Sequence, residues 1–198
     1  PYDRPPNRVR GQGPPVPCRM TAAASRPAAP GRSGTWQPVQ MGACSGRTFL
    51  VTGANTGIGL ATATGLAERG GRVVLACRDL AKAAAARDAI ASATGSEALD
   101  LLALDLADLD AVRETVAEIE RLDLPVDVLI ANAGLAGQRG ETAQGFELAF
   151  GVNHLGHFLL TTLLLPRLRT RTDARVVLVS SDSHYQVKAI DWDEVEGP

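Results

Sequence analysis

The sequence predicts an α/β fold in which helices cover both faces of a parallel sheet. Three observations support this. Short apolar runs alternate with helical stretches from about residue 46 onward, a glycine-rich turn follows the first apolar run, and polar motifs follow the later runs. Strands and helices alternating at these lengths imply right-handed crossovers, and therefore a doubly wound parallel sheet.

The expected elements follow the chain in order. We expect strands around Phe49–Val51 and at Arg72–Cys77, Leu101–Leu104, Val126–Gly134 and Ala174–Ser181. We expect helices at Ile58–Arg69, at Leu80–Thr94 closed by Gly95, from an Asp108 cap to about Leu122, and from Phe146 to Pro166.

Composition indicates one domain with a good core and no polyanionic partner. The 198 residues are 45% hydrophobic and 21% charged, with a net charge of -2, so nothing indicates nucleic-acid binding. The cysteines Cys18, Cys44 and Cys77 show neither metal-site nor disulfide spacing, which is typical of a reducing compartment. No run approaches the ~18 apolar residues of a transmembrane helix, so we expect no membrane span.

Residues 1–45 have a different composition, which predicts a disordered leader. Nine of the twelve prolines precede Val39, and Asp3 is the only acidic residue of the leader. This arginine-rich composition fits either a transit peptide or a tail without function. We expect a cytoplasmic protein, or an organellar one if the leader is a transit peptide.

The glycine-rich turn lies in RTFLVTGANTGIGL, residues 47–60. Gly53 allows a sharp exit from the strand, Gly57 allows the backbone to approach a ligand, and Gly59 allows the helix to pack tightly on the sheet. A helix beginning near Thr56 or Gly57 would point unpaired N–H groups at a pyrophosphate.

The motif TGANTGIG resembles the glycine motif of the short-chain dehydrogenase/reductase family. Together with the later ACRD and NHLGHF, it is most similar to the retinol dehydrogenase branch. The resemblance covers residues 46–198 and implies a Rossmann-type domain that binds NADP. It also implies hydride transfer between nicotinamide and a carbonyl or alcohol substrate, lipophilic ones included, with homodimers or homotetramers in complete members.

The resemblance implies a set of cofactor contacts. They are Gly53, Asn55, Thr56, Gly57, Ile58, Gly59, Arg78, Asp105, Leu106, Asn132, Ala133 and Gly134.

Cofactor preference depends on the end of the second strand. Cys77 stands where NAD-binding members carry an acidic residue, and Arg78 can pair with the 2′-phosphate of NADP. NADP is therefore expected over NAD, although Thr56 is neutral where other members have a second basic residue. An ordinary surface arginine is the alternative interpretation of Arg78.

Two further cofactor contacts have alternatives. By resemblance, Asp105 contacts the adenine amino group, whereas helix capping is the alternative, for which Asp108 is better placed. Asn132 resembles the asparagine that ties neighbouring strands together, and a turn asparagine is its alternative.

Asn153 and Ser181 are the expected catalytic residues. By resemblance, Asn153 bends its helix and holds a water in a proton relay, and Ser181 donates to the substrate oxygen, with Ser180 and Ser183 as alternatives. His154 and His157 flank Asn153. With no second cluster of ligands, these histidines are interpreted as structural rather than metal-binding.

The resemblance fails at the Tyr-x-x-x-Lys motif that defines the family. Tyr185 and Lys188 are one residue too close and follow Ser181 too soon, so we do not assign them as catalytic. The resemblance therefore implies an inactive fragment, whose doubly wound parallel sheet is truncated after the fifth strand. We expect this strand to be left as an uncovered edge that promotes self-association. The alternative is a non-catalytic dinucleotide-binding sensor or interaction module.

Overall fold

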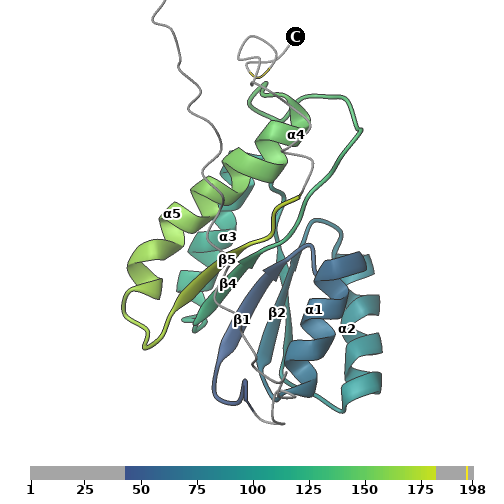
Figure 1. The fold of residues 1–198 in the computed structure, drawn as a ribbon. Coiled ribbons are helices and arrows are strands. Elements are labelled where there is room, and N and C mark those ends of the chain that lie inside the picture. Colours follow the sequence, from purple (N-terminus) through teal and green to yellow (C-terminus); the bar gives the residue numbers. More distant parts are fainter. Residues whose placement is uncertain (1–42, 182–194, 196–198) are drawn as a thin grey trace, which may run out of the picture. The chain divides into compact units, whose positions relative to one another are not determined.

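The computed structural model describes residues 43–181 and residue 195. Within them, five parallel strands form one sheet in the order β3-β2-β1-β4-β5 (Figure 1). The predicted doubly wound α/β fold is confirmed. Residues 1–42 of the expected leader, together with Tyr185, Lys188 and Ser183, lie outside the described residues.

The strands are β1 (Thr48–Thr52), β2 (Arg72–Cys77), β3 (Leu99–Ala103), β4 (Val128–Ala131) and β5 (Arg175–Leu178). The helices are α1 (Gly57–Glu68), α2 (Leu80–Thr94), α3 (Leu109–Arg121), α4 (Leu148–Phe150), the π-helical η1 (Gly151–Gly156) and α5 (His157–Leu168). The predicted β2 and α2 have these same bounds. β3 begins and ends earlier than predicted, and β4 and β5 are shorter than predicted. The register pairs of β4 with β5 run from Val128 to Ala131 on β4.

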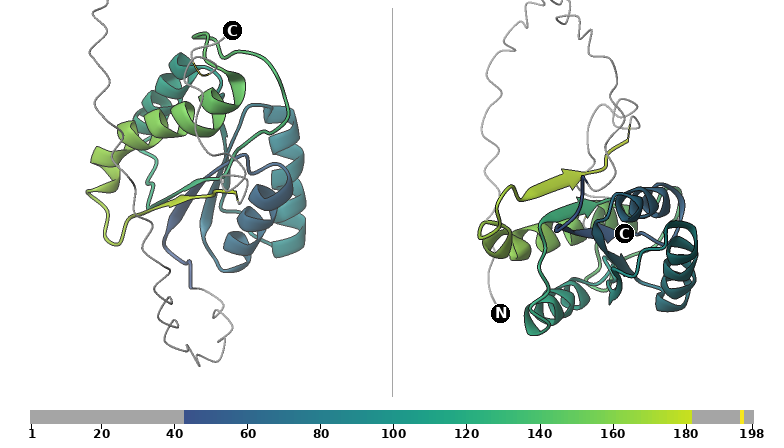
Figure 2. Two further views of the ribbon diagram at one scale, coloured as in Figure 1. Left: turned by 45° about the horizontal axis from the view of Figure 1, so that its top comes forward. Right: turned by 90° about the horizontal axis from the view of Figure 1, so that it is seen from below.

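Two helical layers enclose the sheet, as the further views in Figure 2 show. Val51, in the centre of the sheet, belongs to the core under α1 and α2, and the adjacent Leu50 belongs to the core under α3 and α5. Both side chains are fully buried. Because neighbouring strand residues point to opposite faces, one apolar run supplies both cores.

The strand order creates a switch point between β1 and β4. β1 runs parallel to both β2 and β4. The chain continues from β1 to β2 and β3 on one side, and then crosses over to β4 and β5 on the other side of β1. In such sheets a crevice opens beyond the carboxyl ends of the strands at this point. The turns that follow β1 and β4 therefore meet there.

The chain from Leu148 to Leu168 forms a single helical run with a π-helical segment inside it. It begins two residues later than predicted and continues past Pro166 to Leu168. Close contacts accompany both ends of the π-helical segment. A Cβ on Gly151 would collide with Thr142, and one on Gly156 would lie 2.5 Å from the Leu106 carbonyl oxygen.

The expectation that no segment is apolar enough to span a membrane was wrong. The 21-residue run 148–168 has a mean hydropathy of 1.4 over its most apolar window, which meets the requirement by length and composition. Core helices meet the same requirement, and a third of this window is buried against the rest of the protein. Leu160 and Leu164 pack in the core, so the helix is weak evidence for a span.

β5 forms an exposed edge. Among the described strands it pairs only with β4, and Val176, Val177 and Leu178 are all exposed, Leu178 to 67%. This agrees with the uncovered apolar edge expected from the sequence.

Candidate functional site

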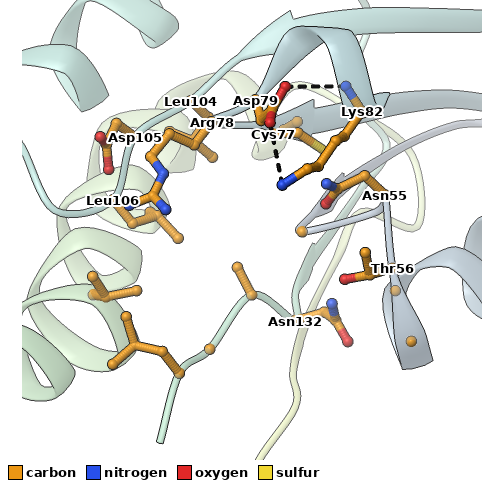
Figure 3. A pocket seen from close by; sticks show the side chains of 18 of the residues that line it. Asn55, Thr56, Cys77, Arg78, Asp79, Lys82, Leu104, Asp105, Leu106 and Asn132 are labelled. Atoms are coloured by element: carbon orange, nitrogen blue, oxygen red, sulfur yellow. Dashed lines mark hydrogen bonds and ion pairs between the residues drawn. The ribbon is translucent and has the colours of Figure 1, made fainter. Parts of the chain in front are cut away.

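A pocket of about 560 Å³ opens beyond the carboxyl ends of β1, β2, β3 and β4 (Figure 3). All twelve residues predicted to contact a cofactor line it: Gly53, Asn55, Thr56, Gly57, Ile58, Gly59, Arg78, Asp105, Leu106, Asn132, Ala133 and Gly134. The structure thus brings these residues together from four separate segments of the sequence.

The turn after β1 depends on two of its glycines. Gly53 has a φ of +65°, and a Cβ there would lie 3.0 Å from two Ala133 carbon atoms. A Cβ on Gly59 would collide with the Gly53 carbonyl and lie 2.5 Å from the Asn132 amide nitrogen. Because glycine has no side chain at either position, α1 can approach the sheet closely at this point.

The amino end of α1 lines the pocket without a side-chain cap. Its N-cap residue, Thr56, makes no capping hydrogen bond, and its first turn has no acidic residue. In α2, by contrast, the N-cap Asp79 accepts a hydrogen bond from a backbone N–H. The first N–H groups of α1 therefore lack intrahelical and side-chain partners, which suits an anion such as a pyrophosphate.

Two cations enter the pocket from the segment after β2. Arg78 and Lys82 are exposed and line it, and Figure 3 shows both side chains extending into it. The Lys82 Nζ lies 3.4 Å from an Asp79 carboxylate oxygen. Hydrogen bonding from the Lys82 backbone N–H, aided by its ammonium group, holds the pKa of Asp79 below its ordinary value.

Cys77 occupies the end of β2 as a neutral thiol. It is 3% exposed, and burial raises its pKa against the opposing effect of hydrogen bonds from the backbones of Ala54 and Asn55. It is therefore not an anion at neutral pH. The position expected to be acidic in an NAD-binding site carries no charge.

Asp105 lies in the pocket, and its side chain closes a local turn. Its Oδ1 accepts from the Ala107 N–H at 2.9 Å. α3 is instead capped by Asp108, whose Oδ1 accepts from the Asp110 N–H at 2.9 Å. The helix-capping alternative for Asp105 does not hold, and its second carboxylate oxygen has no hydrogen bond among those observed in the described residues.

Asn132 ties β4 to β1. Its side-chain amide donates to the Thr52 carbonyl at 2.9 Å. Its backbone N–H and that of Ala133 both donate to the Thr52 hydroxyl, each at 2.9 Å. Asn132 therefore connects two strands and is not an isolated turn residue.

The two residues expected to be catalytic do not line the pocket. Asn153 is exposed within η1, where its amide accepts from the Leu135 N–H and donates to the Leu135 carbonyl, both at 2.9 Å. Leu135 itself lines the pocket, so Asn153 reaches it through this backbone. Ser181 is exposed and lies three residues beyond β5, next to Ser180.

The two histidines beside Asn153 have different environments. His154 is exposed, with its ring centroid 5.1 Å from that of Phe150 and 6.2 Å from that of Phe158. His157 is 6% exposed, and its Nε2 lies 2.9 Å from the Thr52 hydroxyl. In the described part of the chain, no group of three His, Cys, Asp or Glu residues could hold a metal ion.

Sequence reasoning missed several residues of the pocket wall: Ala76, Cys77, Asp79, Lys82, Leu104, Leu135, Gln138, Val152 and Val179. Lys82 matters most because it provides a second cation. Its position in the first turn of the helix directly after β2 was a usable signal, since that turn meets the carboxyl edge of the sheet.

Comparison of the sequence with known proteins identifies relatives of this chain. The family model for short chain dehydrogenases matches residues 47–190. Human retinol dehydrogenase 13 is 47% identical over 151 residues, which cover 76% of this chain and 45% of that protein. The chain thus spans less than half the length of this curated relative.

Solved structures show the same fold. A chain from Escherichia coli CFT073, described as a short chain dehydrogenase complexed with NADPH, has a TM-score of 0.65 and 28% identity, covering 76% of this chain and 65% of that one. A Shigella flexneri chain of the same description, complexed with NADP, has a TM-score of 0.64 and 26% identity, covering 76% and 65%.

Proposed function

The chain belongs to the short-chain dehydrogenase family, and we propose that it forms the NADP-binding part of an oxidoreductase that acts on a carbonyl or alcohol. The single observation that carries this proposal is the pocket, which combines an uncapped helix terminus with two cations beyond β2. When bound, a nicotinamide cofactor supplies or accepts the hydride.

The residues of the pocket fit a dinucleotide along its length. The turn from Gly53 to Gly59 would hold the pyrophosphate through backbone N–H groups, since no side chain caps α1 there. Asp105 would accept from the adenine amino group with the oxygen not bonded to Ala107. Asn132 connects β1 to β4, and the adjacent Ala133 and Gly134 would leave room for the nicotinamide ribose.

The preference for NADP rests on charge. Arg78 and Lys82 would pair with the 2′-phosphate, while the uncharged Cys77 offers no carboxylate to the ribose hydroxyls of NAD. Asp79 does not reverse this preference, because it caps α2 and pairs with Lys82.

The catalytic roles are proposed from the family resemblance. Ser181 would donate a hydrogen bond to the substrate oxygen and polarise the carbon that receives hydride. Asn153 would hold the active-site side of the Leu135 loop through its paired hydrogen bonds. A lipophilic substrate is proposed by similarity to proteins named retinol dehydrogenases.

Cofactor titration tests the proposal. Binding of NADPH and of NADH is measured by fluorescence for the unaltered chain and for Arg78→Gln. We expect tighter NADPH binding, and a rise of about tenfold or more in the NADPH Kd of Arg78→Gln, because charged hydrogen bonds are lost. The NADH Kd is expected to change little.

Two further variants sharpen the test. Lys82→Gln is expected to weaken NADPH binding less than Arg78→Gln, since Lys82 is shared with Asp79. Arg169→Gln, at an exposed site at the end of α5, is the matched control and is expected to leave both Kd values unchanged. Tighter binding of NADH than of NADPH would overturn the NADP assignment.

A further inference from the structure

A hydroxyl at the carboxyl end of β1 fixes the protonation of a buried histidine. The Thr52 oxygen receives two backbone N–H donors, from Asn132 and Ala133, and also lies 2.9 Å from Nε2 of His157. A hydroxyl has one proton and two acceptor lone pairs. With both lone pairs occupied, the Thr52 proton is donated to His157, so Nε2 carries no proton.

The remaining nitrogen of His157 points back to its own helix. Nδ1 lies 3.3 Å from the Asn153 carbonyl oxygen, which can only accept, so a neutral ring donates its proton there. Burial lowers the pKa of His157, opposed more weakly by the backbone carbonyls of Asn153 and Val152. Among the described residues, no charged side chain from β1, β4 or the helical run is hydrogen-bonded to the ring.

These bonds join two parts of the site that are distant in sequence. Thr52 connects the ends of β1 and β4, while His157 follows η1, the segment that carries Asn153. Asn153 in turn holds the backbone of Leu135, which lines the pocket. The hydrogen bonds therefore connect the carboxyl ends of β1 and β4 to η1, and η1 in turn to Leu135 in the pocket wall.

We propose that His157 is a positioning residue: as a neutral ring with its proton on Nδ1, it fixes the η1 turn of Asn153 to the carboxyl ends of β1 and β4. It touches neither cofactor nor substrate and acts through Thr52 and Asn153. η1 is π-helical, and such turns lack the regular i to i−4 bonds of an α-helix and often occur at functional sites. The role rests on the proposed cofactor site, because its effect is on binding there.

The first test is the tautomer, which requires no cofactor. The chain has three histidines, so nitrogen-15 NMR of the imidazole rings, compared with the spectrum of His157→Gln, identifies the His157 signals. We expect a proton on Nδ1 alone at neutral pH. A proton on Nε2, or a doubly protonated ring at neutral pH, would overturn the proposal.

The second test separates positioning from space filling. His157→Phe keeps a ring but loses both hydrogen bonds, and its NADPH Kd is expected to rise about fivefold to tenfold. His157→Gln places an amide where it can still accept from Thr52 and is expected to recover most of the affinity. His154→Phe, on the exposed face of the same helical run, is the control and is expected to bind like the unaltered chain.

Folding of each variant is checked by circular dichroism. If His157→Phe does not fold, His157→Asn replaces it, because asparagine keeps a donor for the Asn153 carbonyl but cannot reach Thr52. Equal affinity of the His157→Phe, or His157→Asn, and His154→Phe variants would refute the positioning role. If the unaltered chain binds no NADPH, the proposed function fails, while the tautomer still tests the network.

Discussion

Replacing Thr52 with valine is expected to destabilise the protein through hydrogen bonds alone. Valine has nearly the same volume, and Thr52 is completely buried, so packing changes little. The hydroxyl serves three partners, namely the Asn132 and Ala133 N–H groups and His157. Each lost bond costs about 1 kcal/mol, and more where the partner stays buried without water.

The three lost bonds together are expected to lower the free energy of unfolding by about 3 kcal/mol. The loss is no larger because Asn132 and Ala133 are only half-buried, so their N–H groups can bind water in part. For a chain of this length, that lowers Tm by roughly 6 to 12 °C. Urea denaturation and thermal melts, both followed by circular dichroism, measure the two quantities.

Thr161→Val supplies a matched control. It makes the same exchange of a hydroxyl for a methyl group, in α5, but the Thr161 hydroxyl is buried with no hydrogen-bond partner among the described residues. Removing an unsatisfied buried polar group is expected to be neutral or to stabilise by about 1 kcal/mol. If Thr52→Val and Thr161→Val gave equal stabilities, the hydrogen-bond assignment at Thr52 would be refuted.

Three other substitutions test separate parts of the fold. Gly59→Ala pushes a methyl against the Gly53 carbonyl, so we expect a loss of at least about 2 kcal/mol in urea denaturation and about tenfold weaker NADPH binding. Asp127→Asn removes the charge and leaves one acceptor oxygen for two donors, Arg171 and the Thr48 N–H, so we expect a loss of about 1.5–3 kcal/mol by the same assay. Leu178→Lys charges the exposed β5 edge, and light scattering is expected to detect less self-association than in the unaltered chain. A monomeric unaltered chain would contradict this last expectation.

The local features of the fold could be predicted from sequence because they are short-range. The apolar run RVVLAC defines β2, and the Asp108 cap begins α3 where expected. The glycine motif placed the pocket at the end of β1 for the same reason, since its turn geometry depends on neighbouring residues.

The features that were missed depend on contacts far apart in the chain. The resemblance implied a bend at Asn153, but not that GVNHLG forms the π-helical η1 with Gly156 lying against the Leu106 backbone. Thr52 and His157 meet across 105 positions of sequence. Lys82 differs from these, because its position in the first turn after β2 was a signal that the sequence contained.

The narrow junction between β1 and β4 is held at both ends by side chains whose charge depends on pH. Only Phe49–Val51 of β1 align with β4, in three register pairs. At the carboxyl end, Thr52 connects to His157. At the amino end, buried Asp127 accepts from the Thr48 N–H and from Arg171, each at 2.7 Å.

The contact of His157 with Thr52 and the contacts of Asp127 with Thr48 and Arg171 should lose their contributions to folding stability in different pH ranges. Burial lowers the pKa of His157, so the stability from its neutral form is complete above the unfolded pKa near 6.5 and is lost as pH falls toward the lower folded pKa. Burial alone would raise the pKa of Asp127, but the bonds from Arg171 and Thr48 outweigh it and lower that pKa. The contribution of Asp127 to folding stability is therefore complete above its unfolded pKa of about 3.9, and is lost as pH falls through the lower folded pKa.

Urea midpoints measured across pH should thus show two declines. His157→Gln is expected to remove the first, and Asp127→Asn to reduce the second, which other carboxylates share. A single decline unchanged by either substitution would mean that the junction is held by its backbone ladder and apolar packing alone.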